Sequence, residues 1–469
     1  MTSLLQRVGS LLYLVSPNAT RYQHEDEIPN YVDESTYIYL FNKEKKFSHF
    51  HPVIQPFFFI YFQAIPLFLA FILLEAAVRF VLGREVRVNE SIASIGVGIL
   101  HEATGFLTVG FILLGYESLY QWRVLDWAWD SLVTWWASLL LVDLCYYWVH
   151  RANHEINFLW AVHQIHHSSE DFTLCSALRL SIFQRLVHFG FYQPLALLGI
   201  PKTSVVVHLG FNYLFQFWVH TDVIRKLGPI EWVFCTPSHH RVHHGANKWC
   251  LDKNYGSVLI IWDRIFGTFQ EEREGEEIVY GLVDQPQSKN SVWHEFFYFG
   301  EVLTKARSMS SWSDSLRAVF YGPGWVPGAP RLGDPDGFPD VRAPRGKYDP
   351  QMPTWFLGYC VAQLFLALVF QQVILARFEV FPWYTTTAYL VFIFLTVGCV
   401  GGIQDGSWWA PYFESLRCLL YVLHAHHARV TPYPVGDGVL MAWFTFCFFL
   451  WLSRAFKGFV GGTTSLKLE

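Results

Sequence analysis

Histidine is concentrated in one part of the chain and is spaced there for metal binding. Of the 20 histidines in 469 residues, 12 lie between His150 and His244. Three short runs place imidazoles three or four residues apart, a spacing at which side chains on a helix point the same way. The runs hold His150 and His154, then His163, His166 and His167, then His240, His243 and His244. Each run is predicted to present two or three nitrogen ligands to a metal.

Eight such imidazoles predict two metal ions, since one transition metal uses roughly four to six ligands. Nitrogen ligands without cysteine favour iron, copper or zinc over calcium or magnesium. Zinc hydrolases usually carry H-E-x-x-H, whereas the turn after His150 reads Arg-Ala-Asn. We therefore favour redox iron that activates O2.

Further polar residues lie near the three runs. His220 ends an apolar stretch and is predicted to be a ninth ligand, with Gln216 one turn earlier as a weaker alternative. His239 is predicted to support the site from outside, because its neighbour keeps the ligand spacing. His188 and His208 lie on apolar segments and are predicted to be core residues.

Two carboxylates are the candidate catalytic residues. Asp143 precedes His150 by two helical turns and so shares its face. Metal-bound histidines usually donate their second N–H to a carboxylate or a carbonyl, and an acid within a lipid-spanning segment requires such a partner. Glu155, next to His154, is predicted to serve in the same way or to touch a bound cofactor.

Composition indicates a membrane protein. The chain is 52% hydrophobic and only 16% charged, against roughly 25% charged residues in soluble proteins. A net charge of −5 supplies no basic field for nucleic acid. The eight cysteines are scattered without a CxxC pair, which argues against a disulfide framework and favours a reducing, cytosol-facing environment.

The fold class predicted from hydropathy is all-α: a polytopic bundle of about seven or eight membrane spans with a cytosol-facing histidine site. Spans must be helical because open strands leave their backbone unsatisfied in lipid, and each needs about 20 apolar residues. The pair His101–Glu102 inside one stretch indicates either a hairpin or a span that lines a cavity. The expected spans are 53–74, 92–116, 131–149, 186–200, 203–221, 353–376, 380–403 and 438–453.

Four regions are expected along the chain. Residues 1–52 form an N-terminal segment, partly at the membrane interface, and residues 53–320 form the membrane-embedded catalytic domain. Residues 321–353 are rich in Pro and Gly and read as a connecting loop. Residues 354–469 form a C-terminal region of transmembrane helices.

Three stretches carry a family resemblance. "DLCYYWVHRANH", "LWAVHQIHHSS" and "HHRVHHGANKWCLDKNYGSVLIIWDRIFGTF" resemble the fatty acid hydroxylase / sterol desaturase superfamily of membrane di-iron enzymes, over about residues 130–270. "SSEDFTLCSALR", "TPSHHRVHHG" and "GPGWVPGAPRLG" resemble the branch of that superfamily that cleaves ether lipids with tetrahydrobiopterin.

The resemblance implies a function. Two irons held by the eight clustered histidines activate O2, and the carbon next to the ether oxygen of a 1-O-alkylglycerol, or of a lyso-alkylglycerophospholipid, is hydroxylated. The hemiacetal collapses to a fatty aldehyde and glycerol, and tetrahydrobiopterin supplies electrons. The enzyme is expected in the endoplasmic reticulum membrane with its site facing the cytosol. The sequence does not decide whether it forms a homodimer.

Other interpretations keep part of this picture. The nearest alternative is a fatty acid or sterol C–H hydroxylase or desaturase fed by external cytochrome b5. The chain carries neither an HPGG motif nor a GxGxxG loop, so reducing equivalents come from a separate molecule in either case. A metal or heme transporter predicts ligands spread through the spans instead of at their ends, and a zinc-dependent hydrolase is a further rival.

Overall fold

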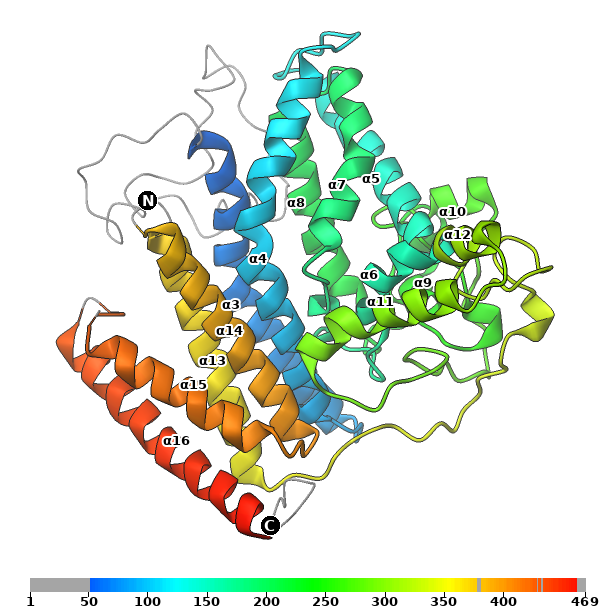
Figure 1. Ribbon diagram of the computed structural model, residues 1–469. Helices are drawn as coiled ribbons and strands as arrows, with labels where there is room; N and C mark the ends of the chain where they lie inside the picture. Colours follow the sequence, from blue (N-terminus) through cyan, green and yellow to red (C-terminus); the bar gives the residue numbers. More distant parts are fainter. Residues whose placement is uncertain (1–50, 378–380, 428, 432, 462–469) are drawn as a thin grey trace.

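The chain is helical throughout the part that the structure describes. The computed structural model describes residues 51–377, 381–427, 429–431 and 433–461, and in them the backbone forms no strand, only two isolated bridges. The all-α prediction is therefore confirmed, while the predicted N-terminal segment lies almost wholly outside the described residues. In chain order the α-helices are α3 (His51–Val81), α4 (Val88–Tyr120), α5 (Leu132–Glu155), α6 (Asn157–His167), α7 (Gln184–Leu197), α8 (Lys202–Val219), α9 (Pro237–His243), α10 (Ile261–Phe266), α11 (Ser291–Arg307), α12 (Trp312–Phe320), α13 (Thr354–Arg377), α14 (Trp383–Gln404), α15 (Ala410–Ala425) and α16 (Pro434–Gly461) (Figure 1).

Helices occupy all eight of the stretches predicted as spans. Within the described residues, four segments are long and apolar enough to cross a membrane: Leu132–Glu155, Thr354–Leu375, Trp383–Gln404 and Pro434–Gly458. Helix α7 has 14 residues, fewer than the about 20 that a span requires. The predicted number of spans is thus approximate, although helices long and apolar enough to cross a membrane occur in both halves of the described chain.

Helix α4 decides between the two alternatives for the stretch that contains His101 and Glu102. It runs unbroken for 33 residues, which excludes a hairpin. Both polar side chains line a cavity, as the second alternative required.

The C-terminal helices share one hydrophobic core with the histidine-bearing part. Helix α15 packs against α16, α13 packs against α14, and both α13 and α14 contact α4. Ile99 and Leu100 of α4 are buried in one cluster with Phe370, Ile393 and Phe444. In Figure 1, α13–α16 lie on one side of α3 and α4, and α5, α7 and α8 lie on the other. Helix α4 therefore joins the two halves.

Short connections bring the histidine-bearing helices together. Helix α5 begins at Ser131, whose Oγ accepts a hydrogen bond from the Val133 N–H at 3.2 Å, a normal N-terminal cap. It ends at Glu155, where the extended backbone of Ile156 turns the chain directly into α6. Helix α9 begins with Pro237, whose fixed φ suits the first helical turn.

The predicted connecting loop lies against the histidine-bearing part of the chain. Arg345 donates to the carbonyl oxygen of Leu282 at 2.8 Å, and Lys347 Nζ pairs with Asp171 at 2.7 Å. Apart from a short 3-10 turn over Pro335–Gly337, the loop is irregular.

The close approach of α14 to the start of α11 provides a stability test. A Cβ atom on Gly401 would stand 2.4 Å from Asn290 Cα, whereas on Gly358 of α13 it would meet nothing within 4 Å. Alanine is favoured over glycine inside a helix by about 1 kcal/mol. Gly358→Ala is therefore expected to preserve or raise the midpoint of thermal unfolding in detergent, and Gly401→Ala is expected to lower it. Equal stabilisation by both substitutions would show that the α11–α14 contact is loose.

Candidate metal centre

The structure brings all nine predicted histidines together in two adjoining groups. Within each group, one ligand nitrogen per residue lies within 4.8 Å of the others, and every member is buried. The rings of His167 and His244, one from each group, stack with centroids 4.3 Å apart. The first group is His150, His154, His163, His167 and His243, and the second is His166, His220, His240 and His244.

Backbone carbonyl oxygens fix the orientation of four of these rings. A carbonyl can only accept a hydrogen bond, so the Nδ1 atom that faces it carries the proton and Nε2 keeps its lone pair. The Nδ1 donors and their acceptors are His150 to Tyr255 O at 2.8 Å, His166 to Arg179 O at 3.2 Å, His220 to Gln216 O at 2.6 Å, and His243 to Lys253 O at 2.8 Å.

The free nitrogens then point at one another. His220 Nε2 stands 3.1 Å from His166 Nε2 and 2.9 Å from His240 Nε2. Because His166 and His220 both hold their proton on Nδ1, no hydrogen lies between their Nε2 atoms. Two lone pairs at this separation repel unless a cation lies between them, so the donor set fits a bound metal.

Burial keeps the imidazoles neutral. Burial first, and then the neighbouring imidazoles, lower the pKa of His163 and His167 well below the usual 6.5. The same two causes lower the pKa of His240 and His244. A neutral imidazole is the form that binds a metal, so the rings are prepared to act as ligands at physiological pH.

Asp263 supports the carbonyl that orients His150. Its carboxylate accepts the N–H of Tyr255 at 2.8 Å and that of Gly256 at 2.7 Å, so the carbonyl of Tyr255 is held in place. A Cβ atom on Gly256 would stand 2.5 Å from the Leu259 carbonyl oxygen, which leaves room only for glycine. This run is part of the family resemblance, but the sequence alone did not indicate its role.

Asp143 has different partners from the one we predicted. It accepts hydrogen bonds from the backbone N–H groups of Val258 and Leu259, at 2.9 and 3.1 Å, and from Trp262 Nε1 at 2.9 Å. His150 donates instead to a main-chain carbonyl. Two helical turns separate the two residues by about 10 Å along the axis, so a shared face does not mean contact. Asp143 acts on the site by holding the loop that follows α9.

Glu155 also turns away from the histidines. Its Oε1 accepts from Arg151 Nε at 2.7 Å, and its Oε2 lies 3.4 Å from Arg331 Nη1. The carboxylate beside His154 is that of Asp252, whose Oδ1 is 3.5 Å from His154 Nδ1. Adjacent residues of a helix point about 100° apart, which explains the error. Asp252 was missed because it lies far along the chain.

Gln216 contributes its backbone to His220. Its side-chain Nε2 donates to Ser257 Oγ at 2.8 Å, while its carbonyl accepts the His220 Nδ1–H. The side chain also lines the cavity described below.

The remaining histidines of this region lie outside both groups. His239 packs against the ring of Phe269 with centroids 5.5 Å apart. His188 Nε2 is 3.0 Å from Asn153 Nδ2, and His208 is buried beside a tryptophan ring of α5. His188 and His208 are thus core residues, as expected.

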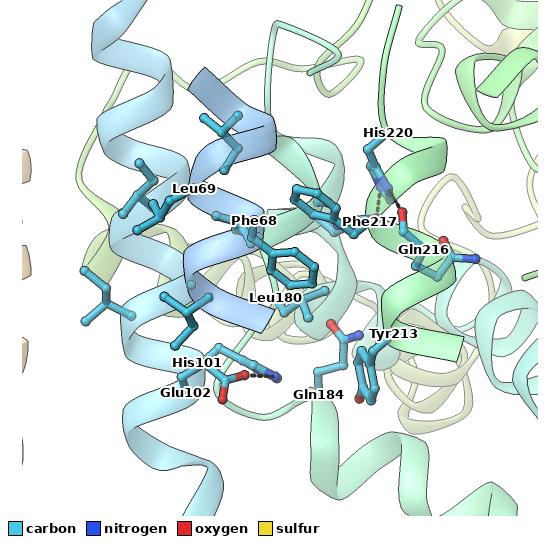
Figure 2. Close-up of a pocket in the computed structure, with 18 of the residues that line it drawn as sticks. Phe68, Leu69, His101, Glu102, Leu180, Gln184, Tyr213, Gln216, Phe217 and His220 are labelled. Atoms are coloured by element: carbon cyan, nitrogen blue, oxygen red, sulfur yellow. Dashed lines mark hydrogen bonds and ion pairs between the residues drawn. The ribbon is translucent and has the colours of Figure 1, made fainter. Parts of the chain in front are cut away.

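A largely apolar cavity adjoins the histidines between α3, α4 and α8 (Figure 2). Its empty volume is about 1150 Å³, which includes space open to the outside. His163, His166 and His220 form one wall. The other lining residues are Ile65, Phe68, Leu69, Ile72, Ile95, Gly98, Ile99, His101, Glu102, Tyr146, Ala177, Leu178, Leu180, Gln184, Tyr213, Gln216, Phe217, Leu368 and Gln371.

Comparison with known proteins agrees with this site. The family described as fatty acid hydroxylase matches residues 135–268, which include all nine clustered histidines. The ornithine lipid hydroxylase OlsE of Rhizobium tropici is 34% identical over 133 residues, covering 28% of this chain and 40% of that protein. No solved structure matches the chain.

Two relatives match nearly the whole chain. The alkylglycerol monooxygenase of Homo sapiens is 35% identical over 459 residues, covering 97% of this chain and 96% of that protein. The enzyme of the same name from Xenopus tropicalis is 34% identical over 481 residues, covering 99% and 98%. With the hydroxylase region and the apolar helices, these matches indicate a membrane lipid monooxygenase with an iron site. The chain belongs to the alkylglycerol monooxygenase family.

Proposed function

We propose that the protein hydroxylates the carbon next to the ether oxygen of 1-O-alkylglycerols with O2 and tetrahydrobiopterin. The observation that carries this proposal is a largely apolar cavity that meets both histidine groups, through His163 of the first and His166 and His220 of the second. The family relatives named for alkylglycerol support the choice of substrate. A fatty acid or sterol hydroxylase fed by cytochrome b5 is the weaker alternative, because the relatives that cover most of the chain are named for alkylglycerol.

We assign the nine histidines as ligands of two irons, five in the first group and four in the second. Nitrogen donors without thiolate suit iron, copper or zinc, and the hydroxylase family favours iron. Iron bound there supplies O2 activation for attack on a C–H bond, with electrons from the pterin. The backbone carbonyls fix four rings before any metal binds, which limits the reorganisation that binding requires.

The cavity positions the substrate. Its Ile, Leu and Phe walls hold the alkyl chain and exclude water, so the ether end meets the histidine wall. The C–H bond next to an ether oxygen is the weakest along the chain, because the oxygen lone pair stabilises the neighbouring radical. The hydroxylated product is a hemiacetal. Its hydroxyl proton passes to the ether oxygen as the C–O bond breaks, which releases a fatty aldehyde and glycerol.

We propose that the histidine side faces the cytosol, in the endoplasmic reticulum membrane. Arg79 forms an ion pair with Asp222 at 2.6 Å, and Arg84 pairs with the same carboxylate at 3.2 Å. Asp222 follows His220 by two residues, so these arginines lie on the side of the site. Cytoplasmic ends of membrane spans are enriched in Lys and Arg.

An assay with two electron donors tests the reaction. Purified protein is expected to release fatty aldehyde from 1-O-hexadecylglycerol with tetrahydrobiopterin and not with reduced cytochrome b5, measured by aldehyde trapping and mass spectrometry. Aldehyde release without any pterin, or oxidation of palmitate driven by cytochrome b5, would favour the alternative.

Paired substitutions test the ligand assignment. His220→Gln is expected to lower bound iron by about half, because the second group then keeps only three of its four histidines and loses its iron. His239→Gln alters the neighbour of His240 without touching either group and is expected to retain the iron. The measurement is metal per protein by mass spectrometry, together with the midpoint of thermal unfolding. Equal iron content in the two variants would remove His220 from the centre.

Glu155 is proposed to serve the reaction at the edge of the site. Glu155→Gln is expected to lower turnover by only about two- to threefold, less than for a partner of a metal ligand, because the carboxylate pairs with Arg151 and Arg331 and not with a clustered histidine. The unfolding midpoint should change little, because a partly exposed ion pair contributes about 1 kcal/mol or less. Unchanged turnover would exclude Glu155 from the site.

A further inference from the structure

The cavity beside the histidines contains a polar recess. Figure 2 shows His101, Glu102, Gln184 and Tyr213 gathered away from His220, with the apolar side chains of α3 on another side. We call these four residues the polar recess. The proposed chemistry at the histidines leaves it without a role.

His101 presents a hydrogen-bond acceptor to the recess. Its Nδ1 is 2.8 Å from the carbonyl oxygen of Ser181, so Nδ1 carries the proton and Nε2 keeps a lone pair. That Nε2 atom has no hydrogen-bond partner among the described residues, and the side chain is only 2% exposed. Glu295 fixes the arrangement by accepting from Ser181 Oγ at 2.7 Å.

Glu102 adds a second acceptor next to the first. Its Oε1 lies 3.8 Å from His101 Nε2, too far for a hydrogen bond. Arg185 holds both residues, since its two terminal nitrogens donate to the His101 carbonyl at 2.7 Å and to Glu102 Oε1 at 2.5 Å. Arg185 therefore fixes two acceptors side by side, the lone pair of His101 Nε2 and the carboxylate of Glu102.

Gln184 supplies a third acceptor. Its Oε1 also has no partner among the described residues, and the residue is 3% exposed. A buried polar atom without a partner is costly. The recess thus offers several acceptors where a ligand with hydrogen-bond donors would satisfy them.

We propose that the polar recess binds the hydroxyl groups of the glycerol headgroup, with His101 and Gln184 as acceptors. This inference rests on the proposed function and names the part of the site that selects the substrate. A glycerol headgroup carries two free hydroxyl donors and no charge. A fatty acid carboxylate has only acceptors and meets Glu102, so it is disfavoured.

The dimensions agree with this role. Tyr213 precedes His220 by seven residues, about 10 Å along α8. A lipid whose hydroxyls lie a few bonds from its reacting carbon reaches both the recess and the histidine wall. The alkyl chain then extends along Phe68, Leu69 and Ile72 of α3.

Binding of two lipids that differ only in hydroxyl groups tests the proposal. The probes are 1-O-hexadecylglycerol and hexadecyl propyl ether, bound to the full-length protein in detergent. Gln184→Met is expected to weaken binding of the glycerol ether about tenfold, as one buried hydrogen bond is lost, and to leave binding of the propyl ether unchanged. KM should rise with little change in kcat. Iron content and the unfolding midpoint are measured alongside.

A matched control lies on the same helix. Gln193 of α7 also has a buried Oε1 without a partner among the described residues, but it is not a cavity-lining residue. Gln193→Met is expected to leave binding of both probes unchanged. If Gln184→Met does not fold, Gln184→Asn withdraws the amide by one methylene and should give the same discrimination.

The outcomes separate the two proposals. If wild-type protein binds both probes equally, or if Gln184→Met weakens both equally, the polar recess does not recognise hydroxyl groups. If the glycerol ether binds through its hydroxyls but yields no aldehyde with any donor, the proposed reaction is wrong and the recess assignment stands.

Discussion

A buried imidazole can serve a metal only while one of its nitrogens keeps a free lone pair, and the catalytic part of the chain is organised around this constraint. Four rings meet it by donating from Nδ1 to main-chain carbonyls, so their Nε2 atoms converge. The loop after α9 supplies two of those carbonyls, from Lys253 and Tyr255. Two aspartates hold the last part of that loop through backbone N–H groups: Asp263 accepts from two of them and Asp143 from two more, a few residues further on.

Buried charges anchor the segment between α6 and α7 in the same way. The Arg179 carbonyl orients His166, and the Arg179 guanidinium pairs with Glu90 of α4, as does Lys289. Arg87 bonds to Asp171 at 2.8 Å. Because these charges are buried among partners of opposite sign, moving one element would leave another uncompensated. These ion pairs therefore keep the carbonyl that orients His166 in its place.

The sequence predicted which histidines cluster more reliably than it predicted which groups orient their rings. Spacing of three and four residues becomes proximity on a helix, so the eight histidines of the three runs could be selected from their spacing alone. The expected contacts of Asp143 and Glu155 with the clustered histidines were wrong, because four of those rings are oriented by backbone carbonyl oxygens, which residue identity does not reveal. Asp252 and Asp263 lie about 100 residues from the histidines they serve, and only folding brings them close. Hydropathy located the helices, of which four in the described residues are long and apolar enough to cross a membrane, but it could not decide that α4 lines a cavity.

Helix α13 forms part of the cavity wall, so the hydroxylase region cannot be separated from the C-terminal helices without opening the cavity. Leu368 and Gln371 close one side of the cavity, although they lie about a hundred residues beyond the region shared with other fatty acid hydroxylases. Grafting that shared region onto a foreign scaffold would transfer the ligands but leave the pocket unwalled. The end of the shared region is therefore not a boundary between independent units. Redesign of lipid preference has to treat both halves of the chain together.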